Sequence, residues 1–185
     1  MEKVTVNMTK TKNPVYFIDE KDVKDLVKSS NPTKRVGDID IPLLEKKLNQ
    51  LPAVDSANVY LNLNGNLNLD IKQRVPAFRL NKDGKDFYVD EKGNEFPISK
   101  NYSFPCMLVT GDVQKSEYQK LAELVDKIDN DEFSKKYFIG VSKEKGGYNL
   151  ITSQGNYKVE IGDLDRIHLK VKGFKTFVEK YLVYQ

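Results

Sequence analysis

The first part of the fold is decided by residues 40–78, DIPLLEKKLNQLPAVDSANVYLNLNGNLNLDIKQRVPAF. Asp40 stands where an N-cap is expected, and Pro42 is tolerated in a first helical turn because the N–H it lacks would have no intrahelical partner. Pro52 cannot continue a helix. The apolar residues between them have the spacing of one helix face: Ile41, Leu44, Leu48 and Leu51. The stretch therefore predicts a short helix that follows Asp40 and is stopped by Leu51-Pro52.

The rest of the stretch alternates apolar and polar residues on both sides of Asn64-Gly65, as in a hairpin with one buried face. Residues directly opposite each other across a hairpin share a face. A two-residue loop would place Leu61 opposite Asn68, whereas a three-residue loop, Asn64-Gly65-Asn66, gives the apolar pairs Leu63–Leu67, Leu61–Leu69 and Val59–Ile71. Since register follows the hydrophobic pattern, we predict the three-residue loop. The predicted core of the stretch comprises Leu44, Leu48, Val59, Leu61, Leu69 and Ile71.

Composition favours a soluble globular protein of one or two domains. The chain has 185 residues, of which 31% are charged and 39% hydrophobic. A net charge of +3, with the signs mixed along the chain, argues against a nucleic-acid-binding face. The single cysteine, Cys106, excludes an intramolecular disulfide and is expected to be a buried strand residue. No apolar run is long enough to span a bilayer and the start has no signal-peptide pattern, which suits a cytoplasmic protein or one whose membrane anchor was removed.

Periodicity predicts an α+β protein with two domains, residues 1–75 and 76–185. In the first domain a strand (residues 4–8) and a helix capped by Asp19 precede the helix and hairpin described above, which gives the order β-α-α-β-β. The second domain is predicted to be mostly antiparallel with two helices, one with a Ser116–Gln119 capping box and one beginning at an Asp163 cap. Its predicted strands are residues 78–80, 87–90, 95–98, 107–110, 137–142, 148–152 and 157–161.

No residue pattern points to catalysis, a cofactor or a metal. The only histidine, His168, lies in the last predicted helix, where a second ligand for zinc is missing and a surface or core-edge position is expected. Two carboxylate clusters, Asp83/Asp86 and Asp129/Asp131/Glu132, are interpreted as caps and solvated turns, because neither has the spacing of a calcium loop. We predict no catalytic, cofactor-binding or metal residue and no enzyme. Exposed strand edges, which can accept a partner strand, remain as candidate sites.

Several short motifs, in this order, carry a family resemblance. The helix-to-strand passage L-P-x-V begins at Leu51, and R-x-P-A follows at residues 74–77. Y-V-D-x-x-G-x-x-F spans residues 88–96, and P-x-x-L with T-G occupies residues 105–111. Together these resemble the bacterial cell-division family FtsQ/DivIB, which has a POTRA module followed by a β-rich domain. The resemblance covers nearly the whole chain. It departs at Gln73, where many members have Glu. Well-known members also have a further strand that pairs with FtsB after the last helix, whereas this sequence stops at Gln185, so the strand is either lost or lies beyond the given sequence.

The resemblance implies a non-enzymatic scaffold of the division complex, anchored in the cytoplasmic membrane by one transmembrane helix that precedes this sequence. Both domains would lie on the extracytoplasmic side and bind FtsB-like and FtsL-like proteins, with FtsB on the second domain; neither nucleic acid nor a small-molecule substrate is expected. The partner-binding candidates are a strand edge and the end of the chain: Tyr157, Lys158, Val159, Glu160, Tyr181, Leu182, Val183 and Tyr184.

Two alternatives remain open from the sequence. One is a POTRA-type chaperone or transport module for envelope proteins, which tandem POTRA units followed by a barrel would favour. The other is a small enzyme of unrecognised type, which requires a polar pocket; loss of turnover on substitution of His168 and Asp90 would favour it.

Overall fold

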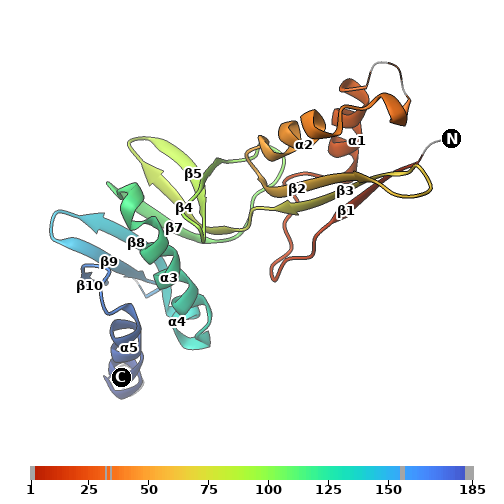
Figure 1. The fold of residues 1–185 in the computed structure, drawn as a ribbon. Coiled ribbons are helices and arrows are strands. Elements are labelled where there is room, and N and C mark those ends of the chain that lie inside the picture. The colour runs from red at the N-terminus through yellow and green to blue at the C-terminus, as the bar shows by residue number, and fades with distance from the viewer. Residues whose placement is uncertain (1–2, 32, 34, 155–156, 182–185) are drawn as a thin grey trace. The chain divides into compact units, whose positions relative to one another are not determined.

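The computed structural model describes residues 3–31, 33, 35–154 and 157–181, of which residues 177–181 are described as backbone only. The chain forms two compact units (Figure 1). The first unit contains Met1–Val75 and Ser99–Ser103, and the second contains Pro76–Ile98 and Phe104–Gln185. Both combine helices with strands, so the α+β class predicted from the sequence is confirmed.

The first unit has the predicted β-α-α-β-β order. Strand β1 (Val4–Met8) is parallel to β3 (Leu67–Gln73), which is antiparallel to β2 (Val54–Leu61), so the sheet order is β1-β3-β2. Two α-helices, α1 (Glu20–Ser29) and α2 (Ile41–Asn49), and a 3-10 turn (Val36–Asp38) complete it. The buried core joins helices to sheet: Val23, Val27, Val36, Leu44, Leu48, Val54, Val59, Leu67, Leu69 and Ile71.

Both predicted N-caps in this unit are present. The Asp19 carboxylate accepts a hydrogen bond from the Asp22 N–H at 2.7 Å, and the Asp22 carboxylate accepts one from the Asp19 N–H at 3.1 Å. Asp40 caps α2 by accepting from the Leu43 N–H at 3.1 Å. These side chains satisfy N–H groups that have no partner inside their own helices, which is why the helices begin where the sequence indicates.

The predicted hairpin pairs are wrong by two positions. Leu61 pairs with Leu67, and Val59 pairs with Leu69. The loop does contain three residues, but they are Leu63-Asn64-Gly65, because the Asn62 N–H donates to the Asn66 carbonyl at 3.0 Å. This placement gives Gly65 the positive φ of 75°, which glycine adopts without strain. A two-residue shift leaves every side chain on its predicted face, but it moves Leu61 to the sheet margin, where it is 43% exposed rather than core.

The hydrogen bonds of Gln73 explain why a glutamine suits the position where many members of the family have glutamate. Its side chain is buried, and the amide Nε2 donates to the Val15 carbonyl at 3.2 Å while Oε1 accepts from the Ile18 N–H at 2.9 Å. An ionised glutamate could accept here but could not donate. The same loop receives Tyr102, whose ring lies edge-on to those of Tyr16 and Phe17 with centroids 5.7 and 4.9 Å away. Sequence periodicity gave no signal for this packing of the 99–103 segment.

The second unit is built on one sheet of order β10-β9-β8-β7-β4-β5-β6. Strand β7 is parallel to β4 and to β8, and the other neighbours are antiparallel. One face packs against α3 and α5 through a core that includes Phe78, Leu80, Val109, Val141, Leu150, Leu121, Val125, Ile128, Ile167 and Val171. The strands are β4 (Pro76–Lys82), β5 (Lys85–Asp90), β6 (Glu95–Pro97), β7 (Met107–Gly111), β8 (Phe138–Glu144), β9 (Gly147–Thr152) and β10 (Lys158–Gly162). The helices are a 3-10 turn (Lys115–Glu117), α3 (Tyr118–Asp129), α4 (Glu132–Tyr137) and α5 (Ile167–Tyr181).

Several helix predictions for this unit are wrong. The capping box joins Gln114 to Glu117 rather than Ser116 to Gln119, since a 3-10 turn precedes α3. Helix α4 was not predicted; its six residues are too few to show a period, although its cap, Asp131, accepts from the Ser134 N–H at 3.3 Å. Three α-helices are thus described rather than two. Helix α5 begins at Ile167, four residues after the predicted cap Asp163.

Of the two single-copy residues Cys106 and His168, only the first differs from its predicted environment. Cys106 lies in the loop before β7 and is half-buried, so it is not the buried strand residue that was predicted. Burial raises the pKa of its thiol to about 12, which keeps the thiol protonated at neutral pH. His168 is exposed on α5, as expected for a surface position.

Candidate partner-binding edge

Strand β10 is a terminal strand of the second unit's sheet and pairs only with β9 among the described residues. Lys158 lies opposite Ile151, Val159 opposite Leu150, and Glu160 opposite Asn149. Just before the strand, the Tyr157 carbonyl accepts from the Thr152 N–H at 3.2 Å. Hydrogen-bonded and non-hydrogen-bonded pairs alternate along antiparallel strands. The main-chain N–H and C=O groups of Lys158 and Glu160 therefore point away from β9, in the direction from which another strand could pair.

A bulge ends this edge at its C-terminal side. Glu160 is opposite Asn149 but Gly162 is opposite Tyr148, so Ile161 is the extra residue. Gly162 has a φ of 70° and Gly147, beside it, a φ of 121°. A Cβ on Gly147 would come within 2.5 Å of the Gly162 carbonyl oxygen. The bulge thus requires a close backbone approach at Gly147, and it limits the regular edge to about the three residues before it.

The predicted partner-binding residues divide into two groups. Tyr157 is 72% exposed, Lys158 and Glu160 are exposed, and Val159 is half-buried against the core. The Lys158 ammonium pairs with the Glu144 carboxylate of β8, which lowers the pKa of Glu144 through that hydrogen bond. In the second group, Tyr181 is the last residue of α5, while Leu182, Val183 and Tyr184 lie outside the described residues.

The β2 edge in the first unit is closed by side chains of α2. The Asn49 amide donates to the Ala57 carbonyl at 3.1 Å and its oxygen accepts from the Ala57 N–H at 3.0 Å. One turn earlier, the Glu45 carboxylate accepts from the Val59 N–H at 2.9 Å. Three main-chain groups that a partner strand would need already have partners. The sequence left exposed strand edges in general as candidate sites, and the spacing of Glu45 and Asn49 on one helix face is the signal that could have argued against this edge.

The opposite edge of the second unit's sheet is protected by its own sequence. Strand β6 has three residues and ends in Pro97, which has no N–H to donate. Short strands and proline are common protections of natural sheet edges. Beside it, Asp90 holds the β5–β6 turn, because its carboxylate accepts from the N–H groups of Lys92 at 3.0 Å and Asn94 at 2.8 Å. The Asp90 carboxylate therefore stabilises the turn that the Y-V-D-x-x-G motif forms.

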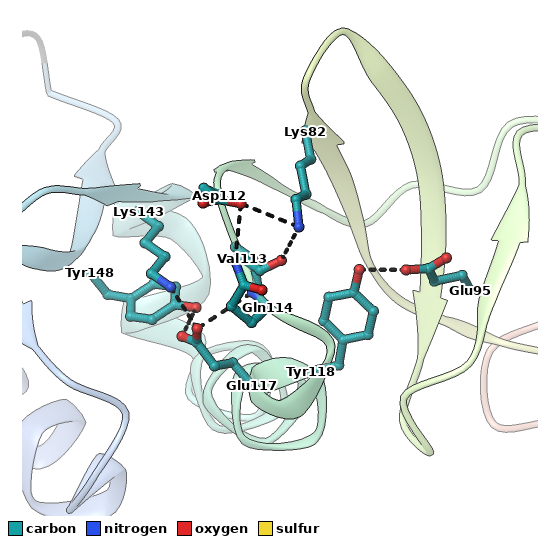
Figure 2. A network of polar contacts seen from close by, with 9 residues as sticks. All are labelled: Lys82, Glu95, Asp112, Val113, Gln114, Glu117, Tyr118, Lys143 and Tyr148. Atoms are coloured by element: carbon teal, nitrogen blue, oxygen red, sulfur yellow. Dashed lines mark hydrogen bonds and ion pairs between the residues drawn. The ribbon is translucent and has the colours of Figure 1, made fainter.

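A polar network in the second unit joins the 3-10 turn before α3 to the sheet (Figure 2). Glu117 points towards β8 and β9, where its carboxylate accepts hydrogen bonds from the Lys143 ammonium and the Tyr148 hydroxyl. Burial raises the pKa of Glu117, but the bonds from Lys143, Tyr148 and the Gln114 N–H outweigh it, and the net pKa is lowered. Burial and the bond to Glu117 raise the pKa of Tyr148. Neither group titrates near neutral pH, as a general acid or base would, so the network acts as a structural junction between α3 and the sheet.

Within residues 3–31, 33, 35–154 and 157–181, histidine, cysteine and carboxylate side chains do not gather in groups of three or more that could hold a metal ion. Over that same part of the chain, none of the helices combines the length and the apolar character needed to cross a membrane.

Comparison with protein families accounts for almost the whole chain. Residues 75–185 match the family model described as FtsQ/DivIB, C-terminal related, and residues 2–72 match the model of a POTRA-like domain. A search of curated proteins gave no match. The FtsQ/DivIB-related match covers more than half of the chain and agrees with the motif order found in the sequence. The chain belongs to the FtsQ/DivIB C-terminal-related family, with a POTRA-like domain preceding the family domain, and so to a group of proteins of bacterial cell division.

Proposed function

We propose that the chain is the extracytoplasmic part of a single-pass protein of the inner membrane that acts as a non-enzymatic scaffold of the division complex. Residues 1–75 would be its POTRA-like domain and residues 76–185 its FtsQ-type β domain. The second domain would bind an FtsB-like protein, and FtsL-like proteins would join the same assembly. The family matches support the division role, and the structural use of Asp90, Glu117 and Tyr148 favours a scaffold over an enzyme.

The observation that carries the proposal is the outer edge of β10, which pairs with no further strand within the described part of the chain. An extended partner segment could add a strand there, using the outward main-chain groups of Lys158 and Glu160 for hydrogen bonds. The exposed ring of Tyr157 offers apolar contact area at the start of the same edge. The opposite charges of Lys158 and Glu160 favour a partner segment with complementary charges.

Proline at position 158 tests the strand-pairing geometry. A Lys158→Pro variant removes an outward N–H, and a proline is tolerated on an edge strand whose N–H faces solvent, so the fold should persist. We expect its affinity for a peptide from the extracytoplasmic part of an FtsB-like protein to fall about tenfold or more. Titration calorimetry measures the affinity, and circular dichroism checks that the fold is retained.

The matched control is Lys158→Ala, which loses the same charge and the same pair with Glu144 but keeps the N–H. Its affinity should change less than threefold, roughly what an exposed ion pair contributes. If both variants bind equally well, or lose affinity equally, the partner does not pair with β10 as a strand.

A further inference from the structure

The turn between β2 and β3 exposes an unusual set of apolar side chains. Residues 60–66, which we call the hairpin tip, include Tyr60 at 40% exposed, Leu61 at 43% exposed and Leu63 fully exposed. Tyr60 and Leu61 are consecutive in a strand and therefore point to opposite faces, while Leu63 lies in the turn itself. The apolar surface thus surrounds the end of the hairpin instead of lying on one face of the sheet.

The hairpin tip also lies in an uncharged part of a highly charged chain. Residues 56–69 contain no Asp, Glu, Lys or Arg, although 31% of all residues are charged. An exposed turn of a soluble protein needs no such exclusion of charge. Charged side chains are costly below the headgroups, in the hydrocarbon of a membrane, whereas leucine is favourable there and tyrosine is enriched at the headgroup level.

Main-chain hydrogen bonding within the hairpin tip is unusually self-contained. The Asn62 side-chain oxygen accepts from the N–H groups of Asn64 and Asn66, each at 3.0 Å. The Gly65 N–H donates to the Asn62 carbonyl and the Asn62 N–H to the Asn66 carbonyl, also at 3.0 Å. These N–H groups do not depend on water, which lowers the cost of moving the tip into a less polar medium.

The start of the chain runs beside this tip. The Leu67 N–H donates to the Lys3 carbonyl at 3.1 Å, and parallel pairing begins with Val4 opposite Leu67. Figure 1 shows the start of β1 and the β2–β3 turn at the same end of the sheet. An anchor joined ahead of Lys3, as in the proposed function, would hold that end of the first unit towards the membrane.

From these observations we propose that the hairpin tip inserts into the lipid surface, with Leu63 deepest and Tyr60 and Leu61 at the headgroup level. The inference rests on the proposed function only for the anchor that brings the unit to the membrane. A lipid surface suits the tip better than a protein groove does, because the exposed apolar groups point in different directions around one end.

A single tryptophan reports the contact, since the chain contains none. A Leu63→Trp variant of the full chain is tethered through an N-terminal histidine tag to phosphatidylethanolamine–phosphatidylglycerol vesicles containing a nickel-chelating lipid. We expect its emission to shift to shorter wavelength and to be quenched by lipids brominated on the acyl chains. The control is Leu169→Trp on α5, where the native side chain is 62% exposed; it should show neither change.

Untethered binding supplies the second measurement. Leu63→Asn should weaken binding of the chain to the same vesicles about tenfold, because one inserted leucine contributes roughly that factor. Its affinity for the FtsB-like peptide in solution should stay unchanged, so that failure of the β10 proposal and failure of this one are distinguishable. Quenching of Leu63→Trp no stronger than that of Leu169→Trp would overturn the proposal. A spectral shift without quenching by brominated lipid would also overturn it, since it would place the tip against protein, such as a second copy.

Discussion

Strands β2 and β10 both end a sheet, yet their outer edges differ in what they can bind. The β2 edge is occupied by Asn49 and Glu45 of α2, which bond to the main chain of Ala57 and Val59. The β10 edge presents the outward main-chain groups of Lys158 and Glu160. Position at the end of a sheet is therefore a weak argument for strand addition, and the side chains packed along an edge decide whether it is available.

The closure of β2 depends on matched spacings. Glu45 and Asn49 are one helical turn apart, a rise of about 6 Å. Ala57 and Val59 are two residues apart along a strand, about 6.7 Å. A helix lying along the strand can thus bring both side chains to the same edge without distortion. Strand β10 is limited in another way, by charged side chains and by the bulge at Ile161.

The largest expected effect concerns the bulge. Gly147→Ala places a Cβ 2.5 Å from the Gly162 carbonyl oxygen at a positive φ, so backbone beside β10 must move. We expect a loss of about 3 kcal/mol in the free energy of unfolding. Urea denaturation measures it. Gly146→Ala is the matched control, because nothing lies within 4 Å of its Cβ, and it should be close to neutral. Equal effects of the two substitutions would mean that the close approach at Gly147 does not matter.

A smaller effect should follow from opening the β2 edge. The double variant Glu45→Ala/Asn49→Ala removes three hydrogen bonds to Ala57 and Val59, and we expect a loss of about 2 kcal/mol in the free energy of unfolding. The uncovered edge should also promote self-association, visible by sedimentation. Lys46→Ala, on an exposed position of the same helix, controls for helix propensity. If the double variant stays monomeric and as stable as the parent, these side chains do not close the β2 edge, and the β2 and β10 edges do not differ in this respect.

The smallest expected effect depends on pH and concerns the contacts of Glu117 with β8 and with β9, the strand that pairs with β10. The folded-state pKa of Glu117 is below its ordinary value of 4.5, so the ionised carboxylate stabilises the fold above that pH. This contribution is lost as the pH falls through the folded-state pKa. Glu117→Gln should therefore cost about 1 kcal/mol near neutral pH and progressively less below pH 4.5. Denaturation at several pH values across that range measures the difference in the free energy of unfolding between variant and parent, with the exposed Glu123→Gln as control. A difference that grows as the pH falls would contradict the assignment.

Elements with local signals could be predicted from the sequence alone. The caps at Asp19 and Asp40 and the β-α-α-β-β order follow from side-chain hydrogen bonding and periodicity within a few residues. Alternation also fixed which face of the hairpin is buried. Alternation could not fix the register, because a shift of two residues leaves every side chain on the same face of the sheet. The register is set by the turn, through the hydrogen bond to the Asn62 side chain and the positive φ of Gly65.

Features that depend on contacts between distant residues could be seen only in the folded chain. The edge of β2 is closed only because α2 lies along it. Tyr102 packs against residues far away in the chain, and Glu117, just before α3, bonds to side chains of β8 and β9. Such contacts leave no period in the sequence, since the side chains that meet are set by packing and not by spacing. For the same reason composition predicted exposed edges in general, while only the folded sheets distinguish the covered edge of β2 from the open edge of β10.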